Sequence, residues 1–143
     1  MWIKETVEGI TKKYKTNDPY AIISAKNIIL VEREMHEDIY GFYKYIRRNK
    51  FIFLNSRLSE PIKRFTSAHE LAHVELHSKT NTPFLRRKTL LSVDRIEQEA
   101  NRFAVELLLL DESIYQYEDT NMTINEIGGI YGVPEEVTHL KKF

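Results

Sequence analysis

The sequence predicts one α+β domain, in which a small antiparallel β-sheet packs on two long helices, with a helical N-terminus and a helical tail. Three observations predict this class. The 143 residues suffice for one hydrophobic core but not two, short β-rich runs precede residue 55, and two longer segments with helical periodicity follow. We expect an N-terminal helix in residues 1–18, a catalytic core in residues 19–110 and the tail in residues 111–143.

Composition excludes several classes of protein. Hydrophobic residues make up 42% and charged residues 29%, which is ordinary for a globular chain and argues against disorder. The 21 Lys and Arg balance the 21 Asp and Glu, so no net field favours nucleic acid or a membrane surface. Cysteine is absent, so a metal ion would need His and carboxylate ligands. No signal peptide or membrane-length apolar run is apparent, and we expect a cytoplasmic protein.

The first elements follow from spacing. Residues 2–15 predict an amphipathic helix, because apolar side chains recur every three or four positions up to the break at residues 16–19. Between residues 20 and 54, runs rich in β-branched and aromatic side chains predict strands, and the polar residues 47–50 predict a hairpin turn. The predicted strands are residues 28–31, 40–46 and 51–54.

The helices after the sheet carry clear end signals. Ser59 is typical of an N-cap, with Pro61 in the first turn, and predicts a helix to about His77. Residues 78–93 have little periodicity and predict a loop of the kind that often borders active sites. A second helix is expected over about residues 93–110, and two short helices separated by a turn are expected in the tail.

His69, Glu70 and His73 form the pattern H-E-x-x-H on the first of these helices. Positions i and i+4 lie about 40° apart and one turn along a helix, so both imidazoles can reach one ion. Glu70 is about 60° from His73, beside the ion, where its carboxylate can take a proton from water. The pattern therefore predicts a catalytic zinc site with Glu70 as general base. The alternative is a pair of core histidines that satisfy each other.

His77 is less well placed to bind the same ion. It lies about 12 Å along the helix axis from His69, so we interpret it as a helix-end residue or a partner of a ligand.

A third ligand is expected from the second helix, where Glu97 and Glu99 compete. Glu97 shares its side of the helix with Ala100 and Asn101, and small neighbours allow two helices to approach closely. This favours Glu97, while Glu99 remains the alternative. Asn101 could orient a ligand histidine by a hydrogen bond. Two histidines and one carboxylate leave the fourth position of a tetrahedral zinc open, although the same donors suit manganese or iron(II).

Together, residues 69–77 (HELAHVELH) and 97–108 (EQEANRFAVELL) resemble the ImmA/IrrE family of bacterial metallopeptidases. The resemblance implies a zincin-like fold of the gluzincin type, zinc ligands at His69, His73 and Glu97, and a catalytic Glu70. It also implies a protein partner. Similar members are anti-repressors of phages and mobile elements that cut a helix-turn-helix repressor, and others answer DNA damage.

Two positions depart from the family pattern. Ala72 stands where members commonly have Gly, and residues 109–111 (LLD) stand where they have Met-Pro. Neither departure touches the expected ligands.

The rival hypothesis is a DNA-binding or protein-binding regulator with a non-catalytic metal site, because residues 124–140 have helix-turn-helix spacing. Against it, Glu135 and Glu136 begin the second helix, where a groove-reading helix would meet phosphate. We therefore expect no direct contact with nucleic acid.

Overall fold

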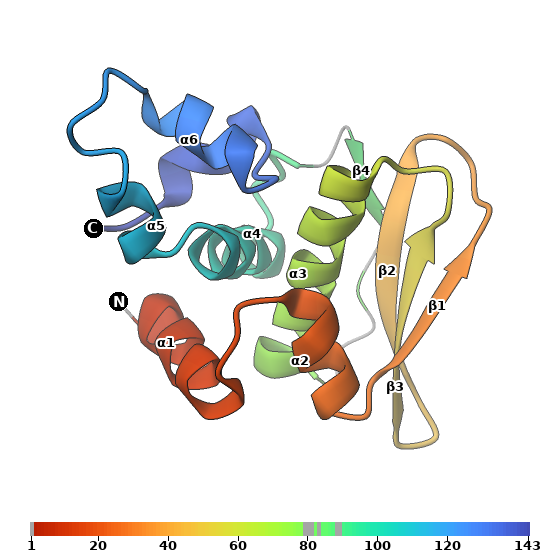
Figure 1. Ribbon diagram of the computed structural model, residues 1–143. Helices are drawn as coiled ribbons and strands as arrows, with labels where there is room; N and C mark the ends of the chain where they lie inside the picture. Colours follow the sequence, from red (N-terminus) through yellow and green to blue (C-terminus); the bar gives the residue numbers. More distant parts are fainter. Residues whose placement is uncertain (1, 79–81, 83, 88–89) are drawn as a thin grey trace.

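The computed structural model describes residues 2–78, 82, 84–87 and 90–143. The predicted α+β class is confirmed: a four-stranded sheet is followed by a layer formed by the H-E-x-x-H helix and then by further helices (Figure 1). In chain order the elements are α1 (Trp2–Tyr14), α2 (Pro19–Ala25), β1 (Ile29–Arg33), β2 (Ile39–Ile46), β3 (Asn49–Asn55), α3 (Glu60–Leu76), β4 (Leu85–Arg86), α4 (Arg95–Leu108), α5 (Asp111–Tyr115), α6 (Ile124–Ile130) and the 3-10 helix η2 (Glu135–Leu140).

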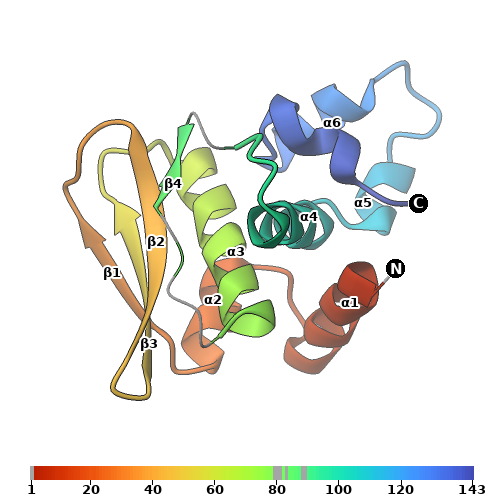
Figure 2. The same ribbon diagram turned by 180° about the vertical axis from the view of Figure 1, so that it is seen from behind.

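All the labelled helices lie on one side of the sheet, as both ribbon views show (Figures 1 and 2). Helix α3 packs against β2 and β3 on one side and against α4 on the other. It is therefore enclosed between two layers, and its residues from Phe65 to Val74 are all buried. In the part of the chain that is described, no helix is both long and apolar enough to cross a membrane.

The sheet has the strand order β1-β3-β2-β4 and is mixed rather than purely antiparallel. Strands β2 and β3 form the predicted hairpin, with Arg47 and Arg48 in its turn at φ 50° and 67°, the left-handed values that a two-residue turn requires. The prediction was wrong for β1, which pairs with β3 in parallel. The reason is that β3 lies between β1 and β2, which run in opposite directions, so a strand antiparallel to β2 is parallel to β1.

Asn55, at the end of β3, holds the connection between β1 and β2. Its side chain is fully buried and donates hydrogen bonds to the backbone carbonyls of Met35, His36 and Ile39. Because buried polar groups need partners, this one amide fixes a loop that carries no regular structure of its own.

Two other elements depart from expectation. Residues 19–25 form helix α2, which was not predicted, and the Asp18 side chain caps it by accepting from the N–H of Tyr20. The loop expected over residues 78–93 contains the short strand β4, which pairs with β2. Residues 79–81, 83 and 88–89 of that loop lie outside the described residues.

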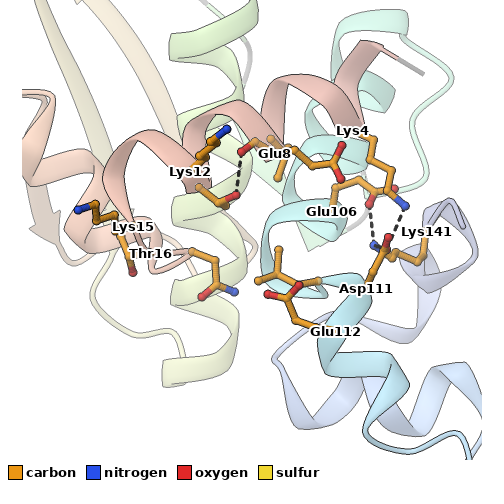
Figure 3. A pocket seen from close by; sticks show the side chains of 13 residues that line it. Lys4, Glu8, Lys12, Lys15, Thr16, Glu106, Asp111, Glu112 and Lys141 are labelled. Atoms are coloured by element: carbon orange, nitrogen blue, oxygen red, sulfur yellow. Dashed lines mark hydrogen bonds and ion pairs between the residues drawn. The ribbon is translucent and has the colours of Figure 1, made fainter.

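A cluster of charged side chains ties the chain ends to α4 (Figure 3). The Lys141 side chain is 2% exposed, and its Nζ lies 2.7 Å from both Glu106 Oε1 and Asp111 Oδ1. Lys4 of α1 lies 3.0 Å from the same Asp111 oxygen. These groups border a cavity of about 440 Å³ between α1 and the end of α4. The cluster therefore joins α1, α4 and the residues after η2.

Removing one member of this cluster leaves a buried charge without its partner. We expect Lys141→Ala to lower the free energy of unfolding by about 3 kcal/mol, measured by urea denaturation, because Glu106 is buried and would lose its cation. Lys142→Ala is the matched control, since its side chain is exposed and only its backbone bonds Glu106. Equal stability of the two variants would contradict the structural role of the cluster.

Candidate metal centre

The two histidines of the H-E-x-x-H pattern lie one turn apart on α3 and face α4. Both side chains are buried, with 0% and 1% of their surface exposed for His69 and His73. Their rings meet edge to face with centroids 5.0 Å apart. Burial of two imidazoles side by side is costly unless each polar atom has a partner, so the surrounding groups decide what this pair can do.

Glu97 of α4 is the carboxylate that meets both rings. One of its oxygens lies 3.0 Å from His69 Nε2 and the other 3.1 Å from His73 Nε2. One potential ligand atom from each of the three residues lies within 4.8 Å of the other two, an arrangement that could hold a metal ion. Of the two glutamates that competed in the sequence, Glu97 is the one brought to the pair, whereas Glu99 contacts His77.

The approach of α4 to α3 depends on small side chains. Ala72 on α3 and Ala100 and Ala104 on α4 are fully buried. Small residues allow two helix backbones to come close together. Ala100 and Ala104 lie on the same side of α4 as Glu97. The Asp94 side chain caps α4 by accepting from the N–H of Ile96, which places Glu97 in the first turn.

Asn101 has the orienting contact that the sequence predicted. Its side-chain nitrogen donates to the Leu90 carbonyl at 2.7 Å, so its oxygen Oδ1 faces His69 Nδ1 at 2.9 Å. His69 must then donate from Nδ1. Its Nε2 faces Glu97 Oε1 at 3.0 Å, and although burial lowers the pKa of His69, this contact raises it overall. The orientation of Nε2 toward Glu97 is the one that a metal ligand requires.

The ionisation states of His73 and Glu97 suit a cation. Burial, together with the neighbouring imidazoles, lowers the pKa of His73 to about 4 despite the opposing effect of Glu97. Burial works against ionisation of Glu97, but its close contacts with His69 and His73 lower its pKa to about 2. At neutral pH the pair is therefore a neutral imidazole beside a carboxylate, the forms that bind metal ions.

Glu70 is buried beside this group and forms no ion pair with any residue that the structure describes. Neither of its carboxylate oxygens has a hydrogen-bond partner among the described residues, and the same holds for His73 Nε2 and Glu97 Oε2. Burial raises the pKa of Glu70 to about 8, with the Glu97 charge adding to the effect and His69 opposing it. Four buried polar atoms without partners in one place fit a site built for a cation and a water molecule.

Comparison with known proteins places the chain in a family. Residues 23–141 match the family model Peptidase_M78, described as the IrrE N-terminal-like domain. The chain belongs to this family. It is 48% identical over 139 residues to "Uncharacterized immunity region protein 2" of Bacillus phage phi105, covering 97% of this chain and 88% of the relative. It is 27% identical over 143 residues to "Metallopeptidase ImmA" of Bacillus subtilis (strain 168), covering 97% and 83%.

The ImmA/IrrE resemblance seen in the sequence is therefore confirmed, and the chain is a member of a family of metallopeptidases. The contact between His77 and Glu99 had no clear signal in the sequence. His77 lies against His73 and Glu99, so it belongs to the surroundings of the metal centre. The four-residue spacing from His73 showed that the rings could meet, but periodicity could not show that Glu99 completes the contact.

The choice between the two glutamates can be tested by metal content. We expect Glu97→Gln to lose stoichiometric zinc, because the amide cannot replace a charged ligand, while Glu99→Gln retains one zinc per chain. Metal analysis after gel filtration measures both against the wild type. The reverse pattern, with zinc lost only from Glu99→Gln, would assign the third ligand to Glu99.

Proposed function

We propose that this protein is a zinc-dependent endopeptidase that cleaves a helix-turn-helix transcriptional repressor at a specific site and so derepresses phage or mobile-element genes. The observation that carries the proposal is the convergence of His69, His73 and Glu97 beside the unpartnered carboxylate of Glu70, in a member of a metallopeptidase family. A merely structural role would not explain an isolated buried carboxylate.

The three convergent side chains would hold the ion. Two imidazole nitrogens and one carboxylate suit zinc and leave a position open to substrate or water, although the same donors accept manganese or iron(II). When bound, the ion supplies a Lewis acid that polarises the scissile carbonyl and makes water more acidic. His69 is oriented for this role by Asn101, and Glu97 contributes the one negative charge among the three ligands.

Glu70 would act as the general base and then as the general acid. A carboxyl group whose pKa is about 8 before metal binding is drawn toward ionisation by a nearby cation, so that it can accept a proton at neutral pH. It would take this proton from the attacking water and pass it to the leaving amine nitrogen as the peptide bond breaks. Its two unpartnered oxygens leave it free to make both contacts in turn.

The proposed substrate class rests on the family resemblance and on the description of the phage relative. That relative is described as an immunity region protein, and the Bacillus subtilis relative as a metallopeptidase. A repressor that maintains silencing is the protein whose cleavage would connect these two descriptions. The expected place of action is the cytoplasm, without direct binding to nucleic acid or to a membrane.

The tail gives little support to the rival DNA-binding function. Its second element, η2, is a short 3-10 helix with Glu135 and Glu136 in its first turn, and its Val137 and Thr138 are buried. Recognition helices are α-helices that expose their first turns to the major groove, where acidic groups meet phosphate repulsion. The pair α6 and η2 instead packs together, and η2 contacts α4.

The role of Glu70 separates the two functions. We expect Glu70→Gln to retain one zinc per chain but to cleave the proposed helix-turn-helix repressor substrate at least about 100-fold more slowly, because the proton acceptor is lost. Mass spectrometry of the fragments measures the rate and the cleaved bond. The control is Glu75→Gln on the same helix, whose side chain pairs with Lys26. Undiminished cleavage by Glu70→Gln would contradict the mechanism, and tight binding of duplex DNA without cleavage would favour the rival.

A further inference from the structure

We propose that His77 and Glu99 are positioning residues, which act through a hydrogen-bonded chain to fix the His73 imidazole as a metal ligand. His77 Nδ1 lies 3.0 Å from His73 Nδ1, and His77 Nε2 lies 2.8 Å from Glu99 Oε1. The chain thus runs from α3 to α4 behind His73, on the side away from Glu97. This inference rests on the metal site of the proposed function and adds two residues to it.

The direction of each hydrogen bond follows from Glu99. Its carboxylate also accepts from Arg95 Nε at 3.3 Å, and a carboxylate paired with a guanidinium offers only acceptors. His77 must therefore donate from Nε2. In the neutral ring its Nδ1 is then an acceptor, and the proton between the two rings belongs to His73 Nδ1.

The last step concerns the ring that would face the ion. With its proton on Nδ1, neutral His73 has a bare lone pair on Nε2, which lies 3.1 Å from Glu97 Oε2 without a hydrogen bond. If the donor and acceptor roles in these hydrogen bonds were reversed, a proton would lie on His73 Nε2, directed at the metal position, and would exclude the ion. Two residues that touch no ligand atom of the site thus select the binding tautomer of His73.

The local backbone holds this arrangement. His77 is the C-cap of α3, and its N–H donates to the His73 carbonyl at 2.8 Å while its φ of −137° ends the helix. The His77 and Glu99 side chains are only 9% and 15% exposed, whereas the Arg95 side chain, at the outer end of this series of hydrogen bonds, is 88% exposed. A partly buried imidazole between a ligand and a carboxylate has little freedom to turn.

The two ligand histidines are therefore supported differently. His69 donates to the neutral amide of Asn101, whereas His73 donates to an imidazole backed by a carboxylate. A carboxylate behind a ligand histidine raises its basicity and strengthens its bond to the metal. Loss of the His77 contact should consequently weaken metal binding even where the fold is intact.

The experiment compares zinc affinity with fold stability in the full chain. His77→Phe keeps a ring of similar size without hydrogen bonds, and we expect it to weaken zinc binding about 10- to 100-fold in chelator competition. His77→Gln, which offers an amide NH₂ donor group and a carbonyl acceptor, is expected to recover much of that loss. His36→Phe is the matched control, because the His36 side chain is 68% exposed and lies in the connection between β1 and β2, where it pairs with Asp38. Urea denaturation of the metal-free proteins should give similar midpoints for His77→Phe and His77→Gln.

A second readout does not depend on any variant. Nitrogen NMR of the wild type should show the proton of His77 on Nε2 and that of His73 on Nδ1. The opposite tautomers, or unchanged zinc affinity in His77→Phe, would overturn the proposal. It would also be overturned if both His77 variants lost the same amount in urea midpoint and His77→Gln recovered no zinc affinity. Wild type that binds zinc with these tautomers but cuts no repressor would contradict the proposed peptidase activity and leave the positioning role supported.

Discussion

The structure depends on one contact, the meeting of α3 and α4 at which a carboxylate reaches two imidazoles. Glu97 lies within 3.1 Å of a nitrogen from each of His69 and His73, and all three side chains are buried. Buried polar groups of this kind are unfavourable unless something satisfies them. A divalent cation would satisfy all three at once, which makes the rest of the fold understandable as a frame for that site.

The sheet and helix α4 contribute differently to this site. The sheet covers one side of α3 and removes water from it, while α4 covers the other side and brings both Glu97 and Asn101. The cluster of Lys141, Glu106 and Asp111 then anchors the end of α4 to the residues after η2. Displacement of α4 would separate the carboxylate from the imidazoles, so the distant ion pairs also serve the site.

The sequence predicted those features that depend on spacing along one helix. The faces of α3 and α4, the approach of Glu97 rather than Glu99 to the two histidines and the contact of Asn101 with His69 all follow from periodicity and side-chain size. The parallel pairing of β1 could not be predicted, because strand order depends on which edge of β3 is free. The contact of His77 with Glu99 was equally inaccessible, since it depends on how the end of α3 lies against α4.

X-ray absorption spectroscopy of the zinc-loaded protein tests the central claim most directly. We predict a first shell with two imidazole nitrogens and one carboxylate oxygen at about 2.0–2.2 Å, completed by a light atom from solvent. The multiple-scattering pattern of two imidazoles would be the decisive feature. A shell with a third imidazole, or with oxygen atoms alone, would contradict a centre made by His69, His73 and Glu97.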